Sequence, residues 1–320
     1  MPTRINRRYV FLGALGLALG CSRRITTSSM AQRVSIVRVP SYTYEIRDVI
    51  CRILQDHAIA VAGKRILLKP NLVEFSAEAP INTNAVLVSA ALEAFSSLGA
   101  AKVTIAEGPG HRRMTLDMAE AAGFFAAIPK FEDRFVDLNN DDVRCVRLAD
   151  SISTLKELYL PDTAFDCDLL VSMPKMKTHH WAGATLSMKN LFGVVPGSVY
   201  GWPKNILHWS GIDESIVDLH HLFPRQFAIV DGIEAMEGNG PILGTSKHMG
   251  VIVAGAHPPS VDATCCQIMK IDPEKIRYLK LFADQTGWNW KQTGQIGETI
   301  ASVSSPFALH RDLQNLRMTA

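Results

Sequence analysis

Two kinds of segment alternate along the 320-residue chain: short continuous apolar runs, and longer stretches in which apolar and polar residues are interspersed. Short runs rich in Val, Ile and Leu are typical of strands buried in a parallel sheet. Between these runs, apolar residues recur at helical spacing, as at Ile46, Val49, Ile50, Ile53 and Leu54. The alternation predicts an α/β fold with a mixed, mostly parallel sheet and helices on both faces. The expected strands are 34–39, 65–68, 102–106, 169–171, 227–230 and 250–254, and the expected helices are 44–57, 82–97, 114–122, 206–222, 260–269 and 274–284.

Residues 131–160 are more polar and alternate Arg, Val and Asp. This pattern predicts a small antiparallel insertion or subdomain within a single large domain that covers residues 34–320. Asn82 or Thr83 is expected to cap the second helix, because either side chain can accept a hydrogen bond from the first helical turn. Gly99 is expected to end that helix.

The first 20 residues have the pattern of an export signal. Arg4, Arg7 and Arg8 precede an apolar run over residues 9–20. That run is shorter than the ~20 apolar residues that a membrane-spanning helix requires, and a basic segment before a short apolar one is typical of a secretory signal. The adjacent arginines resemble those of a twin-arginine signal, which predicts export in the folded state.

Cys21 is expected to be the lipidated first residue of the mature protein, because residues 18–21 resemble a bacterial lipobox. Residues 21–33, rich in Ser, Thr and Arg, would form a tether. The segment therefore predicts a periplasmic or cell-envelope protein anchored to a membrane through Cys21. Two alternatives stay open: cleavage after Ala31, where small residues have the required spacing, and a translation start at Met30.

Charge and cysteine content argue against several classes of function. Removing the three arginines of the signal lowers the net charge of the chain from +2 to −1, so no nucleic-acid partner is expected. The chain has six cysteines but no Cys-x-x-Cys pair, so neither an iron–sulfur cluster nor a structural zinc site is expected. The glycine-rich loops lack the spacing of a dinucleotide or P-loop motif, so no nucleotide cofactor is indicated.

Polar side chains follow the expected strands at the positions where a ligand site should form. In open α/β sheets, ligands bind beyond the carboxyl ends of the strands. Lysines, carboxylates and histidines meeting there would be suited to binding an anion and moving a proton. Gly108 and Gly110 would allow the backbone to approach such a ligand closely. The residues that follow the strands are Lys69, Asn71, Glu107, His111, Lys175, Asp231 and His257.

The segment 172–190 concentrates three lysines and two histidines behind an expected strand. If it is extended, Lys175, Lys177 and His179 share one face. Such clustered cations lower one another's pKa and are best tolerated around an anion. Because His179 and His180 are neighbours, at most one of them is expected to point into the site. The alternative is a solvated basic loop.

Five ordered motifs together resemble the bacterial and archaeal family called domain of unknown function 362, over residues 64–266. Some members of that family carry ferredoxin-type cysteine clusters, and this chain has none, so the resemblance implies no electron-transfer role here. The loops at 108–111 and 177–179 are also similar to the histidine and lysine loops of the lactate racemase family, which implies acid and base chemistry on a small carboxylate. The five motifs are residues 68–73, 107–111, 174–179, 188–193 and 231–232.

The predicted function is that of an exported enzyme acting on a small anionic molecule. His111 or His179 is expected to transfer a proton. Glu107 or Asp231 is expected to orient that histidine. The alternative is an anchored protein that binds an anion or a metal without turnover, and a divalent cation such as Mg²⁺ or Ca²⁺ stays open as a ligand. The residues expected to hold the substrate are Lys69, Asn71, Gly108, Gly110, Lys175, Lys177 and Lys189.

Overall fold

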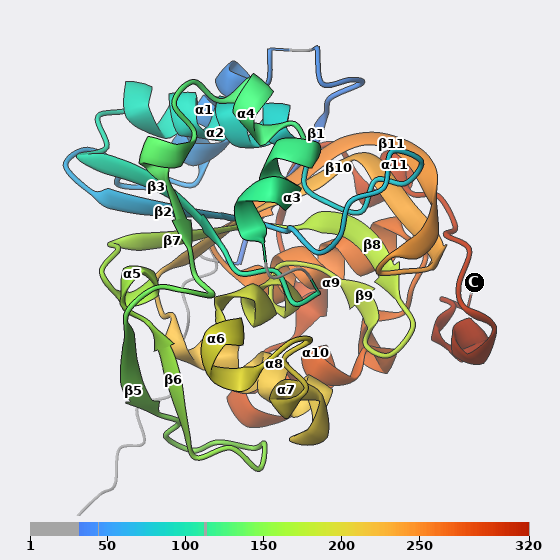
Figure 1. The fold of residues 1–320 in the computed structure, drawn as a ribbon. Helices are drawn as coiled ribbons and strands as arrows, with labels where there is room; N and C mark the ends of the chain where they lie inside the picture. Colours follow the sequence, from blue (N-terminus) through green and yellow to red (C-terminus); the bar gives the residue numbers. More distant parts are fainter. Residues whose placement is uncertain (1–31, 44, 112–113, 320) are drawn as a thin grey trace, which may run out of the picture.

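A computed structural model describes residues 32–43, 45–111 and 114–319 (Figure 1). In this part of the chain, one ten-stranded mixed sheet forms the centre, and a separate two-stranded antiparallel sheet lies beside it. The expected export signal, the lipidation site Cys21 and nearly all of the tether lie outside the described residues. No helix among the described residues is both long enough and apolar enough to cross a membrane.

The main sheet has the order β12-β1-β11-β10-β7-β2-β3-β4, with β8 and β9 continuing from β10. The pairs β10–β7, β7–β2, β2–β3 and β3–β4 are parallel, whereas β11 runs antiparallel to both its neighbours. This confirms the predicted mixed, mostly parallel sheet. The strands are β1 (Val34–Arg38), β2 (Arg65–Pro70), β3 (Lys102–Glu107), β4 (Phe135–Asp137), β7 (Leu169–Met173), β8 (Lys175–His179), β9 (Gly183–Thr185), β10 (Gln226–Asn239), β11 (Leu243–Gly255) and β12 (Gln295–Gly297).

Helices cover both faces of the sheet, with α1, α2 and α4 above it and α8 and α10 below it in Figure 1. The α-helices are α1 (Ile46–Asp56), α2 (Ala85–Ser97), α3 (Thr115–Ala121), α4 (Phe124–Ala127), α5 (Asp162–Phe165), α6 (Gly197–Tyr200), α7 (Ile206–Trp209), α8 (Ile212–Leu222), α9 (Pro258–Ile268), α10 (Arg277–Thr286) and α11 (Ile300–Val303). The 3₁₀ helices are η1 (Glu132–Arg134), η2 (Lys189–Val194), η3 (Pro273–Lys275), η4 (Trp290–Gln292) and η5 (Arg311–Leu316).

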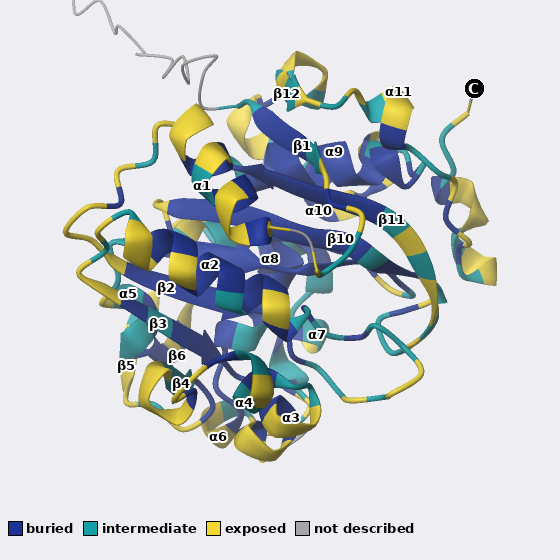
Figure 2. Cartoon of the chain, turned by 90° about the horizontal axis from the view of Figure 1, so that it is seen from above, coloured by how far each residue is buried: buried dark blue, intermediate teal, exposed yellow. Residues whose placement is uncertain are grey.

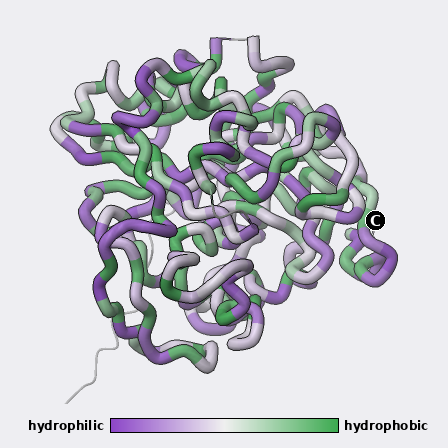
Figure 3. The backbone as a smooth tube through the Cα atoms, in the orientation of Figure 1, coloured by the Kyte–Doolittle hydropathy of each residue, from purple (hydrophilic) through white to green (hydrophobic). Residues whose placement is uncertain are grey.

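Two hydrophobic cores lie on opposite faces of the sheet because side chains alternate along each strand. In β2, Ile66 and Leu68 pack with α1 and α2, whereas Leu67 packs into the core that contains α8, α9 and α10. The central strands are buried and the outer helix faces are exposed (Figure 2). Hydrophobic and hydrophilic positions alternate along the covering helices (Figure 3).

The structure corrects two expected helix boundaries. The cap of α2 is Asn84, whose side chain accepts a hydrogen bond from Val86 N at 2.9 Å. Asn82 and Thr83 instead hold neighbouring backbone, since the Asn82 side chain accepts from Val73 N and the Thr83 hydroxyl donates to Met173 O. The single helix expected at 206–222 is split into α7 and α8 at Gly211, whose φ of +97° is outside the helical range.

Residues 131–160 contain the expected antiparallel insertion. Its hairpin is formed by β5 (Val143–Arg147) and β6 (Glu157–Pro161), which make up the separate two-stranded antiparallel sheet. The same segment also contains β4, which joins the main sheet in parallel with β3. The hairpin of β10 and β11 is much longer than the two short strands predicted, and its tip reaches the cavity described below.

Candidate functional site

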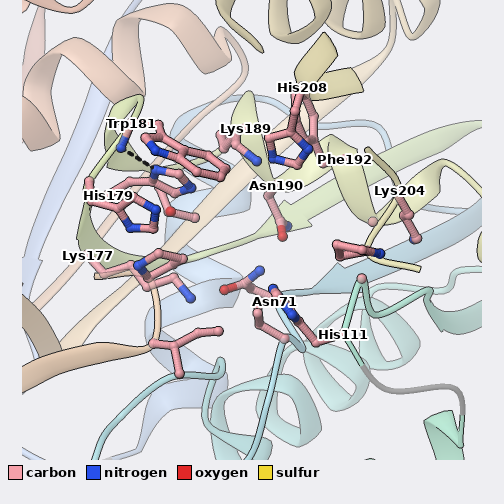
Figure 4. A pocket seen from close by; sticks show the side chains of 18 of the residues that line it. Asn71, His111, Lys177, His179, Trp181, Lys189, Asn190, Phe192, Lys204 and His208 are labelled. Carbon is pink, nitrogen blue, oxygen red and sulfur yellow. Dashed lines mark hydrogen bonds between the residues drawn. The ribbon is translucent and has the colours of Figure 1, made fainter. Parts of the chain in front are cut away.

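A cavity of about 710 Å³ lies beyond the carboxyl ends of β2, β3 and β8. Ligands of open α/β sheets bind at this edge, beyond the carboxyl ends of the strands. Its volume falls within the ~300–1,000 Å³ typical of small-molecule sites. Figure 4 shows the labelled side chains arranged around an open space, with Asn71 and His111 facing Lys189 and His208. The lining comes from the segments 71–73, 107–111, 177–185, 189–193, 203–208, 239–243 and 310–312.

Glu107 lines the cavity and is paired from behind with Lys69. Both side chains are buried, and Lys69 Nζ lies 2.5 Å from Glu107 Oε2. The other carboxylate oxygen accepts a hydrogen bond from Gly108 N at 2.9 Å. Burial lowers the pKa of Lys69, and the negative charge of Glu107 opposes that shift. Lys69 therefore supports Glu107 without lining the cavity itself.

Lys175 and Asp231 form a second buried pair, which does not line the cavity. Lys175 Nζ lies 2.7 Å from Asp231 Oδ2, and the Tyr42 hydroxyl donates to Asp231 Oδ1 at 2.8 Å. The backbone N–H of Asn84 also donates to Asp231. The pairing of β8 with β10 places Asp231 directly opposite Lys175. Lys175, Lys177 and His179 were expected to share one face towards a ligand. Lys177 and His179 line the cavity, whereas Lys175 is paired with Asp231 outside it.

Lys177, Lys189 and Lys204 are the lysines that line the cavity, and each is at least nine-tenths buried. Lys177 donates to Ile81 O at 2.8 Å, and Lys204 donates to Gly108 O. Burial lowers the pKa of both Lys189 and Lys204 to about 7. Burial and then the neighbouring lysines hold the pKa of Lys177 well below its ordinary value.

Lys189 makes no hydrogen bond or ion pair with any residue in the part of the chain that the structure describes. Its Nζ instead lies 3.5 Å from the centre of the Phe192 ring. A cation over an aromatic face is attracted by the ring quadrupole. The ammonium hydrogens remain open to a ligand in the cavity.

His179 and His180 both line the cavity, where only one of them was expected. The alternation rule fails because β8 ends at His179 and His180 lies in the following turn. Their rings stack at a centroid distance of 5.1 Å. His179 Nδ1 accepts hydrogen bonds from Trp181 N at 3.1 Å and Ala182 N at 3.2 Å. His179 must therefore carry its proton on Nε2 and act as a donor, and burial holds its pKa well below the usual value.

His180 has the opposite arrangement of ring nitrogens. Its Nδ1 lies 2.7 Å from Gly240 O, and a carbonyl oxygen can only accept, so Nδ1 carries the proton. Nε2 then keeps a lone pair, which accepts no hydrogen bond from the described residues. Two adjacent histidines thus offer the cavity a hydrogen-bond donor and a proton acceptor.

The remaining predicted residues are placed as follows. Asn71, Gly108, Gly110 and His111 line the cavity. Burial is the largest cause of the lowered pKa of His111. Gly108 is required sterically, because a Cβ there would lie 2.8 Å from Gly193 O. His257 caps α9 through Ser260 N and does not line the cavity.

Sequence reasoning missed Lys204 and His208, which come from the loop and short helix between α6 and α8. The strand-end rule cannot find residues that no strand precedes. The sequence feature that could have indicated them is the short polar segment with Lys204, Asn205 and His208, which follows a Trp-Pro pair. Burial is the largest cause that lowers the pKa of His208 to about 4.

Several buried polar atoms of cavity residues lack a hydrogen-bond partner among the described residues. They are Asn71 Oδ1, Thr185 Oγ1 and His208 Nδ1. Unpartnered buried groups of this kind are unfavourable unless a ligand or water satisfies them. Within the described residues, no group of three or more His, Cys, Asp or Glu side chains is placed to hold a metal ion.

A family profile described as Domain of unknown function (DUF362) matches residues 66–267. The chain is 28% identical over 222 residues to the thylakoid-associated protein sll1697 of Synechocystis sp.. That match spans 67% of this chain and 65% of the relative. A crystal structure of a protein from Thermotoga maritima, 11% identical, superposes over 72% of this chain and 59% of that one with a TM-score of 0.40.

Proposed function

This chain belongs to the DUF362 family, and we propose that it binds a small organic anion in the cavity and moves a proton on that anion. The observation that carries the proposal is an excess of buried basic side chains over buried carboxylates at the cavity. Lys177, Lys189 and Lys204 face the cavity, and its buried carboxylate, Glu107, is already paired with Lys69. Buried charges are normally paired, so an anionic ligand is the missing partner.

The side chains around the cavity have distinct roles in this proposal. Lys189 and Lys177 hold a carboxylate group of the substrate, and Nε2–H of His179 donates to the oxygen on which negative charge develops. His180 Nε2 accepts a proton from the carbon beside that group, and the electron pair passes towards the stabilised oxygen. His111, across the cavity, is the candidate for returning a proton. Glu107 balances the charge of the lysines.

Binding is tested by thermal melts with lactate, malate and mandelate at constant ionic strength. A ligand at ~100 times its Kd stabilises the folded protein by about 2.7 kcal/mol. Lys189→Gln should lose that stabilisation. Lys291→Gln is the matched control, because Lys291 is exposed and paired with Glu274 outside the cavity. If none of these anions, and none of a wider panel of carboxylates and phosphates, stabilises the parent, the anion site is refuted.

Turnover is tested by incubating the same acids in D₂O and measuring exchange of the Cα hydrogen by mass spectrometry. The parent should exchange it, and His180→Gln should abolish exchange while keeping the thermal stabilisation. Stabilisation without exchange on any acid would support the alternative, a protein that binds an anion without turnover.

We also propose export and anchoring through Cys21, which the arginines and the short apolar run of the N-terminus support. The mature chain should begin at a lipidated Cys21 and partition with membranes. Cys21→Ala should release the protein or leave it unprocessed. An intact Met1, or a mature chain that begins near Gln32, would contradict the anchor.

A further inference from the structure

The cavity changes in character from its floor to its mouth. Lys177 and Lys189 at the floor are 0% and 8% exposed. The apolar residues Trp181 and Leu243, which also line it, are 62% and 75% exposed. Large apolar side chains at the mouth of a charged cavity indicate that the ligand extends outward from its anionic group.

Aromatic rings form a continuous wall between these two ends. The wall consists of Phe192, His208, Trp181 and His180. Phe192, which carries the Lys189 ammonium on its face, contacts His208 with ring centroids 5.9 Å apart. His208 contacts Trp181 at 5.3 Å, and Trp181 contacts His180 at 4.7 Å. Neighbouring rings meet edge to face, and Trp181 at the mouth is 62% exposed, so a ligand can stack on its ring.

The tip of the β10–β11 hairpin adds further apolar surface. Pro241, Ile242 and Leu243 line the cavity there. A three-carbon acid would leave most of a volume of about 710 Å³ unfilled, since cavities of ~300–1,000 Å³ typically enclose drug-sized ligands. The size of the cavity and its lining therefore favour the same larger ligand.

We propose that the ligand is an aryl-substituted carboxylic acid that keeps a hydrogen on the carbon beside its carboxylate, such as an arylacetic acid, bound with its carboxylate on Lys189 and its ring system along the aromatic wall. This inference rests on the proposed anion site and names the class of substrate for it. The stacked ring contributes affinity beyond the ionic contact, because aromatic pairs gain from their quadrupoles as well as from burial. Trp181 is then a specificity-determining residue.

The test measures affinity by calorimetry for acetate, cyclohexanecarboxylate, benzoate, 2-naphthoate and decanoate. Affinity should rise at least tenfold from acetate to 2-naphthoate, and benzoate should bind more tightly than cyclohexanecarboxylate. Trp181→Ala should weaken 2-naphthoate at least fivefold and leave acetate unchanged, and Trp181→Phe should restore most of the loss. Trp209→Ala is the matched control, because Trp209 is 81% exposed and does not line the cavity.

The outcomes separate this inference from the proposed function. Equal affinities across the series, or a Trp181→Ala variant that binds 2-naphthoate like the parent, would overturn the aromatic class while leaving the anion site intact. Tighter binding of decanoate than of 2-naphthoate would assign the wall to an alkyl chain and overturn the inference. If no carboxylate binds at all, the proposed function itself fails.

Discussion

At the scale of single residues, the two buried lysine–carboxylate pairs differ in where the carboxylate lies. Lys69 holds Glu107 at the wall of the cavity, whereas Lys175 holds Asp231 away from it. Both lysines follow buried strands, and both looked like substrate ligands in the sequence. The two lysines differ in their carboxylate partners. The register of the strands places Asp231 opposite Lys175, and register depends on pairing between residues far apart in the sequence.

Lys175→Met should strongly destabilise the protein. The substitution leaves Asp231 buried without its cation, and removing one partner of a buried pair costs ~3–5 kcal/mol. Asp231→Asn in the same chain should recover part of the loss. Urea denaturation measures both effects. A loss below ~1 kcal/mol, the range of a surface ion pair, would show that the pair is unimportant for stability. Anion-dependent stabilisation of the folded variant should be unchanged, since Lys175 does not line the cavity.

Gly193→Ala should disturb the site through Glu107. A Cβ at Gly193 would lie 1.8 Å from Glu107 Oε1 and 2.5 Å from Lys69 Nζ, so the buried pair must move. Overpacking of this kind costs ~1–3 kcal/mol, and carboxylate binding should weaken with it. Gly110→Ala is the control for stability, because its Cβ would meet nothing closer than 3.7 Å. Equal stability and binding in the two variants would contradict the tight packing behind Glu107.

At the scale of elements, periodicity was sufficient to predict most of the fold. The apolar spacing in α1 predicts its buried face correctly, and all five residues that define the spacing are buried. Breaks were harder to predict, because one glycine in a permissive conformation, Gly211, divides a helix whose polar and apolar pattern continues through it. The length of β10 and β11 also escaped prediction, since their outer parts pair with each other beyond the hydrophobic runs.

The candidate site was predictable where a strand led to it, and at Lys189, which the concentration of basic residues in the segment 172–190 indicated. Asn71, Glu107, His111, Lys177 and His179 were found in this way and line the cavity. The cavity residues from the α6–α8 segment and from the hairpin tip could not be predicted. Their positions depend on how elements far apart in the sequence pack together, and a local sequence pattern does not indicate that packing. The tautomers of the two adjacent histidines were likewise invisible, because a backbone carbonyl from the hairpin tip sets one of them.

The hairpin of β10 and β11 should control His180 through Gly240. A Cβ at Gly240 would lie 2.0 Å from Thr178 O, so Gly240→Ala must push the hairpin tip away from β8. His180 Nδ1 would then lose its acceptor, and ¹⁵N NMR of the ring nitrogens should show a mixture of tautomers in place of one. Leu243→Ala changes the same hairpin without this clash and should keep the parent spectrum. A single unchanged His180 tautomer in Gly240→Ala would contradict the control of that tautomer by the Gly240 carbonyl.

At the scale of the whole molecule, two hydrophobic cores pack on the sheet, and its carboxyl edge brings together lysines from several segments. Three cavity lysines reach this edge from β8, from η2 and from the loop after α6. Burial without an anion lowers the pKa of these lysines. The folded protein is therefore less stable without an anion than with one bound. Stability, pH and anion binding should therefore be coupled.

The sign of that coupling can be tested between pH 7 and 8.5. Lys189 and Lys204 have a pKa of about 7 in the folded protein, compared with ~10.4 in an unfolded chain. Above pH 7 the unfolded chain binds more protons, so the free energy of unfolding should rise with pH across this window. The window stops at 8.5 because burial raises the pKa of Cys167, Cys265 and Cys266, and these thiols make stability fall above the ~8.5 of an unfolded cysteine.

A bound anion should flatten the trend, because its charge raises the pKa of both lysines towards the ordinary value, and the folded and unfolded chains then bind nearly the same number of protons. Binding of benzoate should take up protons at pH 7.5, and the stabilisation it gives should shrink from pH 7 to 8.5 as the lysines lose their charge. Calorimetry in two buffers of different ionisation enthalpy measures the proton uptake, and melts with and without benzoate measure the stability. In Lys189→Met the rise of stability with pH should be smaller and the proton uptake lower than in the parent. If the variant and the parent show the same pH slope and the same uptake, Lys189 is not the group through which charge, ligand and fold are linked.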